Sequence, residues 1–256
     1  MIDLHCHILS GLDDGAKSVE DSLAMAEMAI ADGITHVVAT PHSSSEYRFD
    51  FAAVQRTAAE LRRAVGDRLK IATGCDFHLN PENIAELKRN AVPFCIHQKT
   101  FLLVEFNEFA IPPGASHTLY EIQLAGLRPI ITHPERNAIL RAHPERLEKW
   151  VRHGNYVQVT GGSVTGSFGA VAQEDALRWI GEGLVHFVSS DAHNIRSRPL
   201  RLRDAYSAVA GKFGEEKAQA LFVENPLAAF EGRDLPHVPE LAEETPEARK
   251  KRFFFF

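Results

Sequence analysis

Histidine and aspartate side chains with metal-ligand spacing stand at the very start of the chain. His5 and His7 follow a short apolar segment, and the loop GLDDG that comes next contains Asp13 and Asp14. Residues two apart in a strand point to the same face, so the two imidazoles could bind one cation. An HxH pair alone is also compatible with two polar residues at a chain terminus. The later segments of the chain distinguish this interpretation from a metal site.

The same pattern returns after most of the later apolar segments. The further candidates are His42 in TPH, Asp76 and His78 in GCDFH, Glu105 in VEF, His133 and Arg136 in THPER, and Asp191 and His193 in SSDAH. The segment VTGG is polar but offers no ligand. Buried carboxylates without cations would repel one another and would be costly to desolvate. The pattern therefore predicts a multinuclear metal site.

Imidazole and carboxylate donors without thiolate suit Zn, Mn or Fe. Cys6 lies between His5 and His7 and would point away from both on a strand, so we interpret it as a small buried apolar residue. A cysteine-phosphatase mechanism is excluded, because that signature requires arginine six residues after the cysteine. The residues six after the three cysteines are Leu12, Pro81 and Phe101, and no GxSxG motif is present.

Apolar strand-like runs alternate with helical patterns over most of the chain. The predicted strands are 2–4, 35–40, 69–74, 100–106, 128–133, 156–160 and 185–191. The predicted helices are 19–32, 51–65, 81–90, 116–125, 144–153, 171–182, 199–212 and 215–223. Repeated βα units with fully apolar strands predict a parallel sheet covered on both faces, and seven of them favour an α/β barrel. In such barrels functional groups collect at the carboxyl ends of the strands, where these candidates stand.

Composition bounds the function further. The chain has 256 residues, 45% hydrophobic residues and a net charge of -6, which argues against general nucleic-acid binding. We expect no signal peptide, because cleavage would destroy a site that begins at residue 5, and no run is long enough to span a membrane. Three cysteines without a CxxC pair are typical of a reducing compartment, so we predict a cytoplasmic protein.

The last part of the chain differs from the rest. We predict one barrel domain over residues 1–231 and a disordered tail over 232–256, which is rich in Pro and Glu. The tail ends RKKRFFFF, a basic-aromatic segment that could make peripheral contact with the inner membrane face, although a tail without a role is the alternative.

Two barrel families start with HxH and end with Asp. Amidohydrolase-type barrels usually carry a bridging lysine mid-chain, whereas this chain offers Glu105, together with His42 and an acidic first loop. That combination resembles the polymerase and histidinol phosphatase (PHP) superfamily. Within it the chain is similar to the manganese-dependent bacterial tyrosine-protein phosphatases of capsule and exopolysaccharide loci, the CpsB/YwqE type. The motifs are MIDLHCHILSGLDDGAKS, ATPH, GCDFHLNPE, LLVEF, ITHPERN, VQVTGGSVTGSFG and SSDAHNIRSRP.

The resemblance implies a distorted (β/α)7 TIM-like barrel of the PHP type with three divalent metal ions, manganese first and zinc, iron or cobalt as alternatives. It implies that the first ion binds His5, His7, Asp76 and Asp191, the second binds Asp76, Glu105 and His133, and the third binds Asp14, His42 and His193. It also implies phosphate binding by Arg136 and Arg198. The family usually has glutamate where this chain has Asp76, and the shorter side chain requires a backbone adjustment of roughly 1 Å.

The function that this resemblance implies is hydrolysis of phosphotyrosine, on a bacterial polysaccharide-export tyrosine kinase, by a metal-bridged hydroxide that attacks phosphorus. Asp14, His42 or His193 could donate a proton to the leaving group. One alternative is a histidinol-phosphate or other small-molecule phosphatase. Another alternative is a PHP-type nuclease, but the negative net charge argues against it. The last is a non-catalytic binding protein, but the nearly complete ligand set argues against it.

Overall fold

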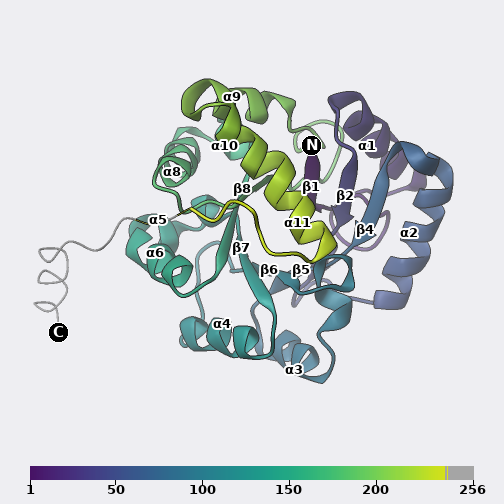
Figure 1. Ribbon diagram of the computed structural model, residues 1–256. Coiled ribbons are helices and arrows are strands. Elements are labelled where there is room, and N and C mark those ends of the chain that lie inside the picture. Colours follow the sequence, from purple (N-terminus) through teal and green to yellow (C-terminus); the bar gives the residue numbers. More distant parts are fainter. Residues whose placement is uncertain (240, 242–256) are drawn as a thin grey trace, which may run out of the picture.

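The structure is a computed structural model that describes residues 1–239 and 241. A ring of parallel strands lies at the centre, and helices surround it (Figure 1). The strands are β1 (Ile2–Cys6), β2 (His36–Ala39), β3 (His42–Ser43), β4 (Lys70–Thr73), β5 (Asp76–His78), β6 (Phe101–Glu105), β7 (Arg128–Thr132), β8 (Tyr156–Thr160) and β9 (Phe187–Ser189).

The nine strands of the described residues occupy seven positions around the barrel. Two positions are each built from a broken pair, since β3 follows β2 and β5 follows β4, with β2 paired to β4 and β3 paired to β5. The order then continues from β5 through β6, β7 and β8 to β9. The ring closes where Cys6 bridges Ala192, beside a 2.8 Å hydrogen bond from the His7 amide to the Ala192 carbonyl. This arrangement confirms the predicted distorted α/β barrel.

The helices follow the strands in the predicted alternation. They are α1 (Val19–Asp32), α2 (Phe51–Val65), α3 (Pro81–Arg89), α4 (Ala115–Leu124), α5 (Ala138–Ala142), α6 (Pro144–Arg152), α7 (Gly161–Val164), α8 (Ala170–Gly181), α9 (Arg203–Phe213), α10 (Glu215–Gln219) and α11 (Asn225–Glu231). Local signals set the ends: Ser18 caps α1 by accepting from the Asp21 amide, and Gly33 ends it at φ +85°. Within the described part of the chain, no helix is both long and apolar enough to cross a bilayer.

Two apolar clusters stabilise the barrel. The larger one lies between the strands and the surrounding helices, and the smaller one fills the barrel interior. Leu4, Val38, Leu103 and Phe187 from the strands meet Phe230 of α11 in the interior cluster. Figure 1 shows α11 crossing the strands beside the start of β1. The helix therefore closes the amino end of the barrel and leaves the carboxyl end open for a site.

An irregularity in β1 directs the first candidate ligands. The register of β1 against β2 shifts between Asp3 and Cys6. Leu4 belongs to the interior cluster, whereas Cys6 lies in the outer cluster and donates its Sγ hydrogen to the Val38 carbonyl. In a regular strand, residues 4 and 6 would share a face, so the irregularity places them on opposite sides. As a result, the side chains of His5 and His7 both point into the barrel mouth.

The chain still contacts the barrel beyond the predicted domain end at residue 231. Arg128 pairs with Asp234 at 2.6 Å, and Leu235 is buried against the interior cluster. The buried Asn225 side chain donates to the His237 carbonyl and accepts from the His237 amide. The remainder of the predicted tail, including RKKRFFFF, lies outside the described residues.

Candidate metal centre

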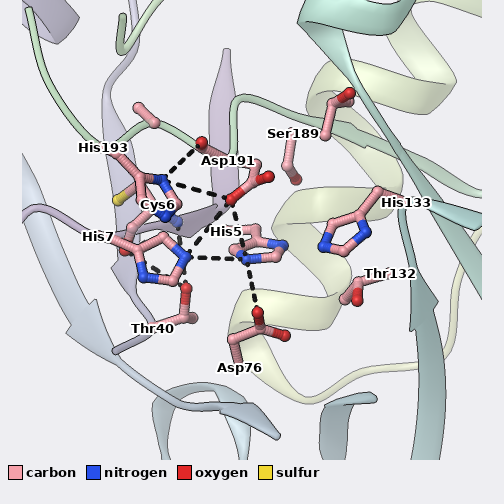
Figure 2. Close-up of polar contacts among 12 residues, drawn as sticks. His5, Cys6, His7, Thr40, Asp76, Thr132, His133, Ser189, Asp191 and His193 are labelled. Carbon is pink, nitrogen blue, oxygen red and sulfur yellow. Dashed lines mark hydrogen bonds and ion pairs between the residues drawn. The ribbon is translucent and has the colours of Figure 1, made fainter. Parts of the chain in front are cut away.

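All nine predicted ligands come together at the carboxyl end of the barrel. Each stands at the end of a strand or in the loop that follows one, except that His42 and Asp76 begin the short strands β3 and β5. Figure 2 shows His5, His7, Asp76 and Asp191 pointing toward one another, with His193 beside them. The broken strand pairs explain the exception, because the breaks before β3 and β5 bring these two side chains to the mouth.

The deepest group of donors contains four almost fully buried side chains. The Nε2 atom of His5 lies 3.4 Å from Asp76 Oδ2 and 3.5 Å from Asp191 Oδ1. His7 Nε2 lies 3.4 Å from Asp191 Oδ1 and 3.3 Å from His5 Nε2. Atoms that share a metal at about 2.1 Å stand about 3.0–3.5 Å apart, so these separations fit a common cation.

A second group lies nearer to solvent. Asp14 Oδ1 is 3.3 Å from His193 Nε2 and 3.5 Å from His42 Nε2. The imidazole rings of His7 and His193 lie with centroids 3.9 Å apart at an interplanar angle of 36°, which links this group to the deeper one. The Asp14 side chain is 44% exposed, so a substrate can approach the site from this side.

A third group surrounds Glu105. His133 Nε2 lies 3.5 Å from Glu105 Oε1, while His42 Nδ1 lies 3.4 Å from Glu105 Oε2 and 3.1 Å from Asp76 Oδ2. His78 also forms an ion pair with Glu105 Oε2. The predicted ligands of the second metal therefore lie together, with His78 as an additional neighbour.

Two side chains that the sequence analysis did not assign orient the histidines. Asp13 Oδ2 lies 2.6 Å from His7 Nδ1 and also accepts from the His42 amide at 3.0 Å. Gln158 Oε1 lies 3.0 Å from His5 Nδ1, while its amide nitrogen donates to the Val159 carbonyl. Partners of this kind hold a proton on Nδ1 and leave Nε2 free to bind a metal. A polar residue in the otherwise apolar run YVQVT was the available signal for Gln158.

Backbone strain marks two of the candidate ligands. His133 and Asp191 have φ values of +31° and +52°, in a region that side chains other than glycine rarely adopt. Such conformations cost roughly 1–3 kcal/mol each and cluster at functional sites. The strain turns the chain sharply after β7 and β9, and it aims both side chains into the mouth.

The buried carboxylates of the site depend on positive charge. Burial raises the pKa of Asp76, but His5 and His42 hold it well below its usual value. Burial also opposes the charged form of His42, yet Asp76 and Glu105 raise its pKa to about 11. Metal ions bind neutral imidazole and ionised carboxylate, so they would take the place of these protons.

Several donor atoms of the site have no hydrogen-bond partner. They are His42 Nδ1, both oxygens of Asp76, Glu105 Oε2 and His193 Nε2. A buried polar atom without a partner costs about 1–3 kcal/mol, so a cluster of them requires an explanation. Imidazole and carboxylate atoms that face one another fit Zn, Mn, Fe or Co, so the residues present fit a metal centre.

The two predicted phosphate-binding arginines lie at the edge of the same mouth. Arg136 Nη1 and Arg198 Nη2 each lie 2.5 Å from Asp191 Oδ2. The Phe168 ring lies beneath both guanidinium groups, with Arg136 Cζ 4.6 Å and Arg198 Cζ 6.0 Å from its centroid. The arginines are thus held beside the donor groups, where they can reach an anion bound there.

The cysteines take no part in the site. Cys6, Cys75 and Cys95 are buried and unpaired, and burial raises the pKa of each thiol, that of Cys95 to about 12. A thiolate nucleophile is therefore disfavoured.

Gly15 has no room for a side chain, and we expect Gly15→Ala to damage the site. A Cβ atom at this position would lie 2.5 Å from His7 Cβ and would overlap the His7 carbonyl oxygen. The acidic loop would have to move, and Asp13 and Asp14 with it. We expect a loss of about 1–3 kcal/mol in the free energy of unfolding, together with lower metal content by elemental analysis.

Gly211→Ala is the matched control for this change, because nothing lies within 4 Å of a Cβ at Gly211 in α9. We expect that variant to keep the wild-type metal content and to be up to about 1 kcal/mol more stable, because alanine favours a helix interior over glycine. Equal stability and metal content in the two variants would show that the loop tolerates a methyl group at residue 15.

Comparison with known proteins agrees with this geometry. A family model described as capsular polysaccharide synthesis, CpsB/CapC, matches residues 1–231. The tyrosine-protein phosphatase YwqE of Bacillus subtilis is 34% identical over 260 residues, which cover 100% of both chains. The tyrosine-protein phosphatase CpsB of Streptococcus pneumoniae is 30% identical over 239 residues, which cover 88% of this chain and 96% of that protein.

A solved structure extends the match to three dimensions. It is described as one of the crystal structures of YwqE from Bacillus subtilis and CpsB from Streptococcus pneumoniae, unique metal-dependent tyrosine phosphatases. It superposes with a TM-score of 0.88 at 32% identity and covers 95% of this chain and 100% of that chain. The resemblance inferred from the motifs is confirmed, and the chain belongs to the CpsB/CapC family of capsular polysaccharide synthesis proteins.

Proposed function

We propose that this chain is a metal-dependent protein-tyrosine phosphatase, which hydrolyses phosphotyrosine to tyrosine and inorganic phosphate. The observation that carries the proposal is the cluster of imidazole and carboxylate atoms without hydrogen bonds, which face one another beside two arginines at the barrel mouth. Relatives that align over most or all of the chain are named tyrosine-protein phosphatases, which supports phosphotyrosine as the substrate.

Three divalent metal ions, manganese first, are part of the proposal. His5, His7, Asp76 and Asp191 would hold the first ion, Asp76, Glu105 and His133 the second, and Asp14, His42 and His193 the third. The separations of 3.3–3.5 Å among these donor atoms support the arrangement. Zinc, iron and cobalt accept the same donor types and are the alternatives.

When bound, such ions activate water as the nucleophile and neutralise charge on the phosphoryl oxygens. The protein's own part is to orient the phosphate. Arg136 and Arg198 keep further N–H groups besides those that contact Asp191, and Arg198 Nε has no hydrogen-bond partner. Their planar guanidinium groups fit phosphate oxygens and stabilise the charge that develops during transfer.

The leaving group of phosphotyrosine has a pKa near 10, so it needs less help from a proton donor than an alkyl alcohol does. Asp14, His42 and His193 lie where a donor would stand. The hydrogen bond with His193 lowers the pKa of Asp14, which keeps this carboxylate ionised. That state suits Asp14 as a metal ligand rather than as a proton donor.

Phe168 is expected to hold both arginines in place. Phe168→Leu removes the ring beneath the two guanidinium groups. Each of the two cation–π contacts stabilises the arrangement by about 0.5–1 kcal/mol. We expect KM for p-nitrophenyl phosphate to rise about 3–10-fold with metal content unchanged. The ring-keeping Phe168→Tyr variant should retain the wild-type KM, and equal KM values in wild type and Phe168→Leu would contradict this role.

Substrate competition tests the proposed function against its nearest alternative. The manganese-loaded enzyme would be assayed for phosphate release from a phosphotyrosine peptide, from the matching phosphoserine peptide and from histidinol phosphate. The proposal predicts that kcat/KM is at least about tenfold higher for the phosphotyrosine peptide than for the other two. A higher kcat/KM for histidinol phosphate would instead favour the small-molecule phosphatase.

The partner and the location are part of the same proposal. We infer that the substrate protein is a tyrosine kinase of polysaccharide export, since the family belongs to capsular polysaccharide synthesis. The segment RKKRFFFF would bring the enzyme to the cytoplasmic membrane face. Deletion of residues 249–256 should then reduce binding to vesicles with anionic lipids, and unchanged binding would end that idea.

A further inference from the structure

His78 lies within the barrel mouth but belongs to none of the three proposed ligand sets. It ends the short strand β5, whose first residue is Asp76. Side chains two apart in a strand point to the same face, so His78 and Asp76 both face the mouth. In the pairing of β5 with β6, His78 is the direct neighbour of Glu105, and its Nε2 atom contacts Glu105 Oε2.

Four donor atoms converge at this point. One atom each from His42, Asp76, His78 and Glu105 lies within 4.8 Å of the other three. His42 Nδ1 stands 3.1 Å from Asp76 Oδ2 and 3.4 Å from Glu105 Oε2. These two separations match those of atoms that share one ion at about 2.1 Å. The direct contact of His78 with Glu105 is shorter, so the two side chains would move apart to admit the ion.

Three of these four side chains have buried atoms that form no hydrogen bond. Asp76 is fully buried, and neither of its carboxylate oxygens accepts a hydrogen bond. Glu105 Oε2 and His42 Nδ1 are also buried without a hydrogen-bond partner. Because buried polar atoms without hydrogen bonds are costly, their shared orientation supports a cation between them.

The two oxygens of Glu105 face different histidines. Oε1 lies toward His133, at 3.5 Å from Nε2, whereas Oε2 lies toward His42 and His78. His133 is therefore on the far side of this carboxylate from the convergence point. His78 lies beside Glu105 Oε2. An additional ligand of an ion bound to this oxygen would have to stand there.

We propose that His78 is a tenth metal ligand, which binds the second divalent transition-metal ion together with Asp76 and Glu105. His42 Nδ1 borders this ion, while His42 Nε2 stays beside Asp14 at the third. This inference rests on the proposed metal centre and adds a ligand to it. His78 is 27% exposed, so its ring borders the solvent side of the site and completes the shell of the ion there.

The alternative role for His78 is to donate a hydrogen bond that positions Glu105. Two substitutions of similar length separate the roles. Gln at residue 78 keeps an N–H donor for Glu105 but is a weak ligand, whereas Glu at residue 78 is a ligand but repels Glu105 unless a cation lies between them. His143→Gln is the control, since the His143 side chain is exposed and pairs with Glu145, which is not one of the site residues.

The experiment measures bound manganese and zinc by elemental analysis after gel filtration, and metal affinity by competition with a chromogenic chelator. We expect His78→Gln to lose one equivalent, or to bind it at least about tenfold more weakly, while His78→Glu and His143→Gln keep the wild-type content. Retention by His78→Gln together with loss by His78→Glu would overturn the ligand role. Wild-type protein that binds no transition metal would instead overturn the proposed metal centre itself.

Discussion

Asp76→Ala is expected to abolish phosphatase activity. Asp76 stands between two donor groups, with its Oδ2 atom 3.4 Å from His5 Nε2 and 3.1 Å from His42 Nδ1. Its removal takes a ligand from two ions at once. Since metal ions contribute several kcal/mol to charge stabilisation, kcat for p-nitrophenyl phosphate should fall about 10³-fold or more.

Metal content distinguishes this effect from a folding defect. Asp76→Ala should lose at least one metal equivalent while circular dichroism shows that the barrel persists. Asp76→Glu keeps the carboxylate and should retain metal, with activity within about tenfold of wild type. Asp67→Ala is the surface control, because Asp67 is exposed. Full metal content and activity in Asp76→Ala would contradict the bridging role.

Arg198→Ala should show the second largest effect, of a different kind. The guanidinium group lies 2.5 Å from Asp191 Oδ2 and has a free Nε, so it can hold phosphate without being a metal ligand. Removing one preorganised donor to a developing oxyanion costs about 10²–10³-fold in rate. We expect kcat/KM for p-nitrophenyl phosphate to fall by this factor while metal content stays at the wild-type level.

Further variants make the arginine prediction more specific. Arg136→Ala should behave in the same way, since Arg136 reaches the same Asp191 oxygen. Arg198→Lys should recover only part of the activity, because lysine cannot form the planar two-point contact. Arg63→Ala, on the exposed side of α2, should have no effect. Loss of metal in Arg198→Ala would instead indicate that the arginine acts by holding Asp191.

Most of the barrel was predictable because its strands are short apolar runs between helices. The predicted helices 19–32 and 51–65 have the same bounds as α1 and α2. The strands β3 and β5 were not predicted, because two or three residues are too few to show a pattern. The last predicted strand, 185–191, ends in the structure at Ser189, since the positive φ of Asp191 turns the chain.

The candidate site was predictable to the extent that it depends on residue type at strand ends. Side chains such as Glu105 and His133 are titratable groups that directly follow apolar runs, which made them visible in the sequence. Asp13 was visible beside Asp14, but nothing in the sequence indicated that it holds His7. The contact between His78 and Glu105 depends on the pairing of β5 with β6, which the sequence does not reveal.

The metal-dependent phosphatase is tested most directly by p-nitrophenyl phosphate hydrolysis in chelator-stripped protein after Mn, Zn, Fe(II), Co or Mg is added back, with His5→Ala alongside. We expect no activity in the stripped protein, recovery with a transition metal and with manganese above all, and no recovery in His5→Ala. Full activity in the stripped protein, or no activity with any metal although metal binds, would contradict the claim that this barrel mouth is a metal-dependent phosphatase site.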